Sequence, residues 1–293
     1  MPKEKVRLAI MAPTLNLCNY LFAINRGYFL KEGLEVEVVI RPGRRNTDAI
    51  VTGDVDFGAA NECVIQAALE GHTELKILLQ VLKDPLHDLI VSKDIENLQD
   101  LKGKRVAVPG PGSTPTVQSG IFFRNNGLIP GQDVFLVVQD KGETMLDRIR
   151  KFEKGEYSGV IASPPTPLLL HKKGFRSLTE LSLHFPGSAS HGLIATTDTI
   201  DNRGPIVEAM VRGFVRGVTT LKRDRKDALD FIVDHYQLEP SIAAQSYDLL
   251  KDRWTAELSL DSLRSEIDFQ SRLAGVEPVS PESIMDDRYT AIR

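Results

Sequence analysis

Short apolar runs alternate with longer segments of helical periodicity in the first part of the chain. Val6–Met11, Glu35–Ile40 and Val55–Ala60 have the length and composition of strands. Between them, Tyr20–Leu30 and Asn46–Val51 have the apolar spacing of helices. Strands that alternate with helices in this way predict a mostly parallel sheet with helices packed on its faces.

The same order of elements returns further along the chain. Arg105–Pro109, Asp133–Val138 and Gly159–Ala162 are the expected strands, and Thr116–Asn125 and Glu143–Glu153 are the helices between them. Two βαβαβ units of similar length predict two lobes of the same design. Ligands of open α/β sheets bind beyond the carboxyl ends of the strands, so we expect one small molecule in the cleft between the lobes.

The remaining segments complete the two lobes. Leu75–Leu82 is a continuous apolar run, typical of a strand covered on both faces. Asp88–Ser92 and Leu193–Thr197 are expected to be the two crossing strands, and the chain from Pro205 onwards has helical spacing. The predicted division is residues 1–88 and 193–293 for lobe 1, with the C-terminal helices, and residues 89–192 for lobe 2.

Composition excludes several classes of protein. The chain has 293 residues, of which 42% are hydrophobic and 26% charged, and its formal net charge is −4. That charge offers no basic surface for nucleic acid. No apolar run approaches the roughly 20 residues that span a bilayer. The residues after Met1 lead directly into a strand, so no secretion signal is visible, and two cysteines do not settle the compartment.

Polar residues that follow the first two strands are candidates for ligand contacts. Thr14, Asn16 and Asn19 lie in the loop after the first strand, where each could instead cap the next helix. Arg44 belongs to a cluster of three arginines after the second strand. Such a guanidinium could pair with a carboxylate, sulfonate or phosphate, although a charged loop is more often simply solvated.

Two further candidates follow the strand that ends at Ala60. Asn61 can both donate and accept, which suits the orientation of a polar group. Glu62 is explained by the helix dipole if it lies in the first turn of a helix. If it faces the cleft instead, it favours a ligand that carries a hydrogen-bond donor or a positive charge.

The second lobe offers a similar set of candidates. Gly112, Ser113 and Thr114 precede a helix whose free N–H groups could bind an anionic or carbonyl group. Ser163 and Pro164 follow the strand Gly159–Ala162. His87 and His191 stand near the expected crossings, where a neutral ring could bind the ligand or serve only as structure. The spacing supports no nucleophile–base pair, and we expect no metal and no cofactor.

Three segments together resemble a known family. Asn25–Val36, Gly53–Gly58 and Asp100–Val108 are similar to segments of the solute-binding proteins of ABC importers, above all the nitrate, sulfonate, taurine and thiamine-precursor group. The resemblance implies an α/β fold of the two-lobed, type II periplasmic-binding-protein class with two crossing strands. It places the ligand loops at Thr14–Asn19, Ala60–Glu62, Gly112–Thr114 and Ser163-Pro164.

The resemblance also implies a function and partners. A protein of this kind is a monomer that closes about a hinge on one small polar molecule, here anionic, aromatic or sulfonate-like, and delivers it to a membrane permease. That role implies the periplasm or cell envelope, with the cytoplasm as the alternative. The same fold resembles thiamine-pyrimidine synthases and aromatic-acid decarboxylases, so an enzyme is the second hypothesis. The cysteine-rich motif of the synthases is absent, which favours a binding protein.

Overall fold

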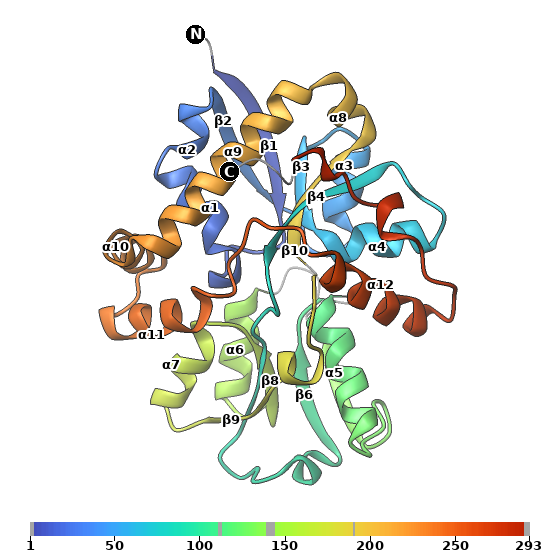
Figure 1. Cartoon of the computed structure of the whole chain (residues 1–293). Helices are drawn as coiled ribbons and strands as arrows, with labels where there is room; N and C mark the ends of the chain where they lie inside the picture. The colour runs from blue at the N-terminus through green and yellow to red at the C-terminus, as the bar shows by residue number, and fades with distance from the viewer. Residues whose placement is uncertain (1–2, 111–112, 139–143, 190, 290–293) are drawn as a thin grey trace. The chain divides into compact units, whose positions relative to one another are not determined.

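The computed structural model describes residues 3–110, 113–138, 144–189 and 191–289. Its chain forms two compact units (Figure 1). Unit 1 comprises Met1–Pro85 and Gly187–Arg293, and unit 2 comprises Leu86–Pro186. Each unit has its own sheet and its own buried core.

Unit 1 contains a five-stranded sheet in the order β2-β1-β3-β10-β4. Its strands are β1 (Glu4–Ile10), β2 (Leu34–Ile40), β3 (Phe57–Ala60), β4 (Leu75–Leu82) and β10 (His191–Thr196). β1 pairs in parallel with β2 and β3, whereas β10 is antiparallel to both β3 and β4. The carboxyl ends of β1 to β4 and the amino end of β10 therefore lie at the same edge of this sheet.

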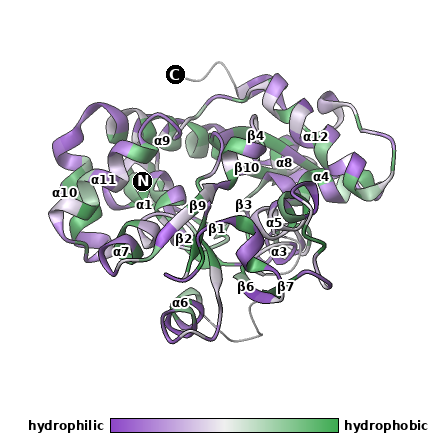
Figure 2. Cartoon of the chain, turned by 90° about the horizontal axis from the view of Figure 1, so that it is seen from below, coloured by the Kyte–Doolittle hydropathy of each residue, from purple (hydrophilic) through white to green (hydrophobic). Residues whose placement is uncertain are grey.

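Helices account for most of the rest of unit 1. They are α1 (Cys18–Asn25), α2 (Tyr28–Lys31), α3 (Arg45–Val51), α4 (Asn61–Leu69), α8 (Thr197–Asn202), α9 (Gly204–Arg223), α10 (Arg225–Tyr236), α11 (Pro240–Leu250) and α12 (Leu260–Ala274). Short 3₁₀ helices span Leu15–Leu17, Pro281–Ser283 and Asp287–Tyr289. In Figure 2, α9 and α10 carry both hydrophilic and hydrophobic residues, as expected of helices with one buried face.

The packing of unit 1 follows from these amphipathic helices. α9 packs on α1 and α2, where the Tyr20 and Phe214 rings lie 4.7 Å apart. A separate buried cluster joins Ile65 of α4 to Leu263 and Ile267 of α12. The apolar stripe predicted for the helix after Pro205 is therefore buried in the core, because it is the face that α9 turns toward its neighbours.

Unit 2 repeats the sheet of unit 1. Its strands are β5 (Asp88–Val91), β6 (Lys104–Val108), β7 (Val134–Val138), β8 (Gly159–Ala162) and β9 (Arg176–Glu180). Their order is β7-β6-β8-β5-β9, with β5 antiparallel to β8 and β9. The strand that follows each chain crossing thus takes the fourth position of its sheet, which confirms the predicted repeat of one α/β design.

Residues of the unit 2 strands alternate between two cores. Leu89, Val106 and Ile161 face the cluster that contains Phe122 and Phe123 of α5 (Thr114–Asn125). Their neighbours Ile90, Ala107 and Val160 face the cluster formed with α6 (Met145–Glu153) and α7 (Thr166–Lys172). Both faces of the sheet are covered, which explains why β8 and most of β5 are buried apolar runs, whereas the edge strand β9 is largely polar. Short 3₁₀ helices span Leu98–Leu101 and Leu181–His184.

Two elements differ from the sequence predictions. The helix expected over Tyr20–Leu30 is divided into α1 and α2, because Gly27 between them has a φ of 70°, a left-handed conformation that interrupts a helix. The short helix α8 was not predicted, since its six polar and β-branched residues lack a clear apolar period.

Candidate functional site

The carboxyl edge of the unit 1 sheet gathers several of the predicted ligand residues. Asn61 and Glu62 begin α4 directly after β3, and His191 begins β10 opposite Ala60. The loop that holds Thr14 follows β1, and Arg44 follows β2. Sheet topology alone places these five residues at one edge, as expected for strands that end there.

Asn61 is buried in an unusual way. Its side chain is 0% exposed, and neither its amide oxygen nor its amide nitrogen has a hydrogen-bond partner among the described residues. It lies against the backbone of Gly192, where a Cβ atom would come within 2.0 Å of the Asn61 oxygen. Only glycine at position 192 leaves room for this amide, so the two residues together form a close-packed corner of the sheet edge.

Glu62 lies in the first turn of α4 and is 1% exposed. Within the part of the chain that the structure describes, neither of its carboxyl oxygens has a hydrogen-bond partner. Burial raises the pKa of Glu62 well above its usual range, and the nearby carboxyl of Glu266 adds to the rise. The helix dipole and the residue's own backbone amide favour the charged form, but neither oxygen accepts a hydrogen bond of good geometry from the described residues.

The carboxyl of Glu266 on α12, unlike that of Glu62, accepts hydrogen bonds from neighbouring residues. Its carboxyl accepts hydrogen bonds from the Ser188 hydroxyl (2.8 Å), the Ala189 amide (3.3 Å) and the Gln270 side chain (3.0 Å). Burial raises the pKa of this carboxyl too, although its three donors oppose the rise. Of this buried pair of acids, Glu266 is satisfied by the protein and Glu62 is not.

His191 is 5% exposed, and burial lowers its pKa to about 4. The ring is therefore neutral near pH 7. A neutral imidazole can offer one donor and one acceptor, but it does not offset the charge of a carboxylate or of an anionic ligand.

The loop after β1 is tied to unit 1 by hydrogen bonds. The Asn19 side chain donates to the Val81 carbonyl at the end of β4 (2.7 Å). The carbonyl of buried Asn16 accepts from the Trp254 indole (3.3 Å), and that of Thr14 accepts from the Tyr236 hydroxyl (3.1 Å). These bonds fix the loop, and contact of the three polar side chains with a ligand stays a prediction.

The guanidinium of Arg44 forms an ion pair within unit 1. Both terminal nitrogens of its guanidinium donate to the carboxylate of Glu70, which follows α4, and the first of these bonds measures 2.7 Å. The pair is about half exposed, so it resembles a surface ion pair. A ligand would have to displace Glu70 to gain the guanidinium, and a ligand role for Arg44 stays a prediction.

The corresponding edge of the unit 2 sheet holds the remaining candidates. Ser113 precedes α5, and its hydroxyl donates to Thr116 (3.0 Å) rather than capping the helix. Thr114 is buried in the first turn, whereas Gly112 lies outside the described residues. Ser163 and Pro164 follow β8, with a cis peptide bond between Pro164 and Pro165.

His87 belongs to unit 2, where it immediately precedes β5. It is 7% exposed, and its carbonyl accepts a hydrogen bond from the Leu181 amide (2.8 Å). The sheet pairing thus places His87 and His191 in different units, each at the amino end of the antiparallel strand. The fold by itself tests no ligand contact of either ring, and both contacts stay predictions.

Two buried charged residues were not among the predicted site residues. Glu266 occupies the apolar face of α12, one position before buried Ile267. Arg148 is 4% exposed on α6, next to buried Ile149, and donates to the Ile161 carbonyl near the end of β8 (3.3 Å). A charged residue within an apolar helical stripe is a signal that could have identified both from the sequence.

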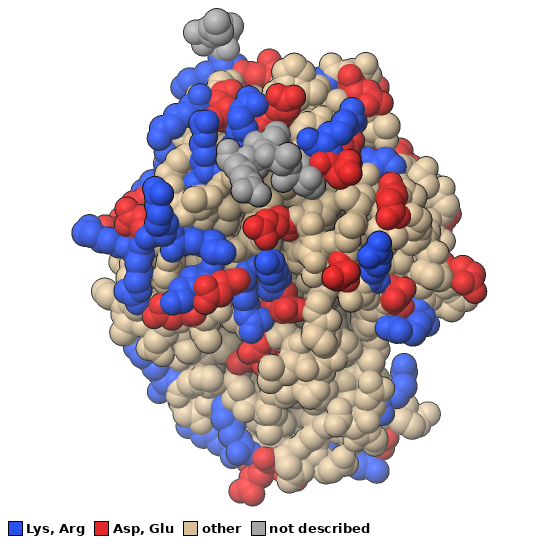
Figure 3. All heavy atoms as spheres, viewed as in Figure 1, with Lys and Arg blue, Asp and Glu red and all other residues tan. Residues whose placement is uncertain are grey.

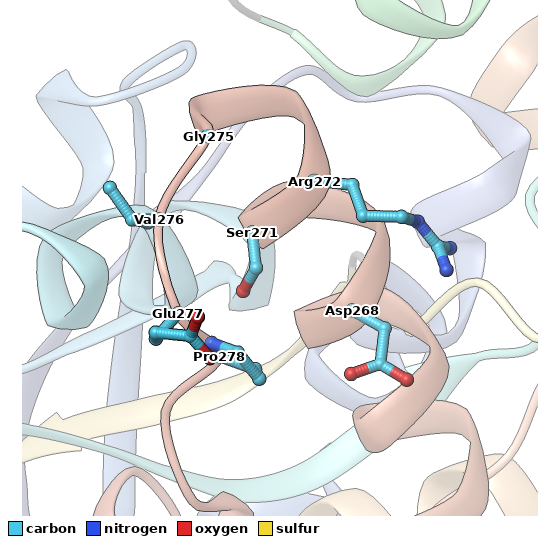
Figure 4. A pocket seen from close by; sticks show the side chains of 7 residues that line it. All are labelled: Asp268, Ser271, Arg272, Gly275, Val276, Glu277 and Pro278. Atoms are coloured by element: carbon cyan, nitrogen blue, oxygen red, sulfur yellow. The ribbon is translucent and has the colours of Figure 1, made fainter.

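An open depression of about 430 Å³ lies at the C-terminal end of α12 (Figure 4). Its lining contains Asp268, Ser271 and Glu277 but none of the predicted ligand residues, and Arg272 points away from Ser271. It lacks the convergent polar groups of a ligand site. Among the described residues, no group of three or more metal-ligating side chains comes together.

The distribution of charged side chains on the visible face is consistent with the small net charge. Figure 3 shows basic and acidic side chains interspersed over the visible face, without a broad field of one sign. Within the described ranges, no helix is both long enough and apolar enough to cross a bilayer.

Comparisons with known proteins agree on the fold. The alkanesulfonate-binding protein SsuA from Xanthomonas axonopodis pv. citri, bound to MOPS, superposes with a TM-score of 0.78 at 14% identity, over 99% of this chain and 98% of that one. The periplasmic aliphatic sulphonate binding protein SsuA from Escherichia coli gives a TM-score of 0.73 at 15% identity, over 97% and 92%. The two-lobed periplasmic-binding-protein fold is thereby confirmed.

A structure of the desulfurization enzyme DszB is also similar. A mutant of DszB in complex with biphenyl-2-sulfinic acid gives a TM-score of 0.71 at 13% identity, over 98% of each chain. Identities this low show that the fold is shared, but they carry no information about which ligand is bound. No curated protein matches the chain significantly in sequence.

The sequence model described as NMT1/THI5 like matches residues 14–228, which is more than half of the chain. The matched range runs from the loop after β1 to α10 and includes the first turn of α4. This match confirms the resemblance that the sequence motifs predicted, and the chain belongs to the NMT1/THI5-like family.

Proposed function

We propose that this protein is the solute-binding component of an ABC importer, binding one small polar molecule that is anionic, aromatic or sulfonate-like. The membership in the NMT1/THI5-like family and the fold shared with two sulfonate-binding proteins support this proposal. The partner is then a membrane permease, and the protein acts as a monomer in the periplasm or cell envelope.

One observation carries the proposal. Asn61 and Glu62 hold four buried polar atoms at the carboxyl edge of the unit 1 sheet to which no described residue forms a hydrogen bond. A buried polar atom without a partner costs about 1–3 kcal/mol, and native proteins contain few of them. A ligand at this edge would satisfy these atoms, and strand carboxyl ends are where open α/β sheets bind their ligands.

Binding would then be coupled to hinge closure. A ligand favours the closed state only through contacts that are stronger there than in the open state. The segments that join the units are anchored in unit 1, where the Asp84 carboxylate accepts from the Gly187 amide (2.7 Å) and the Ser188 amide (3.1 Å). Rotation about Pro85–Leu86 and Pro186–Gly187 would move unit 2 while these anchors stay intact.

A ligand screen tests the function directly. The purified full chain is screened by thermal shift against sulfonates, aromatic acids, amines, amidines and pyrimidines, and each hit is titrated by calorimetry. We expect a ligand that raises the unfolding temperature, decreases the radius of gyration in small-angle scattering, and is recovered unchanged by mass spectrometry. Failure of every compound to bind would contradict the proposal.

An enzyme on the same fold is the second candidate, and the likeness to DszB favours it. DszB is a desulfurization enzyme, so a protein with this fold can be a catalyst. The same screen separates the two functions, because an enzyme converts its ligand. A product that accumulates at a rate proportional to protein concentration would replace the binding role with catalysis, and cell fractionation would then be expected to find the protein in the cytoplasm.

A further inference from the structure

The buried pair Glu62 and Glu266 indicates what kind of group the ligand presents to unit 1. Both acids are nine-tenths or more buried, and they come from different helices, α4 and α12. Two carboxyl groups brought together out of water are costly unless donors or cations compensate them. Hydrogen-bond donors or cations are therefore expected next to each of the two carboxyl groups.

Of the two acids, only Glu266 accepts hydrogen bonds from other described residues. Glu266 accepts from Ser188, Ala189 and Gln270, which supply three donors to its two oxygens. Glu62 accepts from none of the described residues. Because Glu62 is 1% exposed, a ligand reaches its carboxyl only when the neighbouring side chains move, and it would then meet a group that no described residue satisfies.

The cationic candidates of this sheet edge do not neutralise Glu62. The Arg44 guanidinium is bound to Glu70 at the opposite end of α4 from Glu62. His191 is neutral because burial lowers its pKa to about 4. Neither Arg44 nor His191 therefore supplies a positive charge to Glu62, so a cationic ligand favours the charged form of this carboxyl, whereas a sulfonate or carboxylate disfavours it.

Asn61 provides the second, independent observation. Its buried amide also lacks a hydrogen-bond partner in the described ranges, and it lies in the space that a Cβ atom at Gly192 would occupy. The amide oxygen can accept one further N–H, and the amide nitrogen can donate to an acceptor on the same ligand. Asn61 and Glu62 thus offer mostly acceptors, which match a group that carries several N–H bonds.

We propose that the ligand presents a cationic nitrogen group, an ammonium or an amidinium, to the carboxylate of Glu62 and the amide oxygen of Asn61. This inference rests on the proposed binding function and specifies its ligand class. The acidic or aromatic part of such a ligand would lie on the other side of the nitrogen group, away from Glu62. A sulfonate without N–H bonds leaves both Glu62 oxygens unpartnered and binds weakly.

Matched compounds and one isosteric variant test the inference. Binding of benzamidine is compared with that of benzenesulfonate, and binding of taurine with that of ethanesulfonate, by calorimetry on the full chain. The variant Glu62→Gln keeps the size of the side chain but replaces one carboxylate oxygen with an amide donor and removes the negative charge. Glu37→Gln on β2 makes the same chemical change at an exposed site and serves as the control.

We expect benzamidine or taurine to bind more tightly than its partner compound by tenfold or more. Glu62→Gln should lower the affinity for the nitrogen compound by at least tenfold, and Glu37→Gln should change it by less than twofold. The thermal midpoint of Glu62→Gln should equal or exceed that of the wild type, which shows that the variant is folded.

The measurements distinguish a failure of the inferred ligand class from a failure of the proposed binding function. Tight binding of benzenesulfonate or ethanesulfonate that is insensitive to Glu62→Gln would overturn the inference and leave the binding function standing. Equal affinities within both pairs would do the same. If neither these compounds nor any member of the wider screen binds the wild-type protein, the proposed function fails and the inference fails with it.

Discussion

Acidification should destabilise unit 1 through His191. The residue begins β10, pairs with Ala60 and Leu82 in neighbouring strands, and is 5% exposed. Burial lowers its pKa from 6.5 to about 4. A base whose folded pKa is depressed binds its proton more tightly when unfolded, so stability is complete above pH 6.5 and is lost as the pH falls toward 4.

The magnitude follows from the size of that depression. Each pKa unit corresponds to about 1.4 kcal/mol, so the free energy of unfolding loses about 2 kcal/mol by pH 5 and about 3 kcal/mol near pH 4. The buried acids Glu62 and Glu266 act in the opposite direction, because their raised pKa values make the folded state bind protons more tightly at low pH. A comparison with a variant is therefore needed to isolate the histidine.

Urea unfolding of the wild type and of His191→Gln, at several pH values between 7.5 and 5, provides that comparison. Groups common to both proteins cancel in the difference between their free energies of unfolding. We expect the difference to shift by about 2 kcal/mol in favour of the variant as the pH falls to 5. Two stability curves that run parallel over this range would refute the buried, neutral state of His191.

Three further changes test other parts of the structure. Gly192→Ala should destabilise the protein by about 1–3 kcal/mol in urea unfolding, because its Cβ would lie 2.0 Å from a buried amide oxygen. The control Gly204→Ala, with no atom within 4 Å, should change stability by less than about 1 kcal/mol, and equal losses would contradict the packing. Asp84→Ala removes the acceptor of two backbone amides and should cost about 1–3 kcal/mol, whereas Asp84→Asn keeps an acceptor and should cost less. For Glu62→Gln, the gain in thermal midpoint over the wild type should grow from pH 5 to pH 8, because the raised pKa of Glu62 makes the wild type lose stability as the pH rises; a constant difference would count against it.

Much of the fold follows from patterns that are local in the sequence. The apolar run Leu75–Leu82 is β4 without a change of boundary, and Gly159–Ala162 is β8. Period and punctuation suffice for such strands because both faces of each sheet are buried. The parallel pairing of β1 with β2 and β3, and of β6 with β7 and β8, agrees with the repeated βαβαβ pattern, whereas the place of each antiparallel strand comes from the structure.

The candidate site could be located from the sequence but not described. Asn61 and Glu62 were expected at a strand end, yet their lack of partners depends on which side chains approach from α12 and β10. Glu266 is 204 positions away from Glu62 along the chain, and no local pattern indicates that α12 packs on α4 or that the charges of the two acids interact. The ion pair between Arg44 and Glu70 is likewise a tertiary contact, which changes the expected use of the arginine.

The most direct test of the proposed binding site is a crystal structure of the protein with a ligand identified by the screen. We predict that the ligand lies at the carboxyl edge of the unit 1 sheet, with polar atoms within hydrogen-bond distance of the Asn61 amide and the Glu62 carboxylate. A ligand bound elsewhere, with these two side chains making no hydrogen bond to it, would contradict the proposed site.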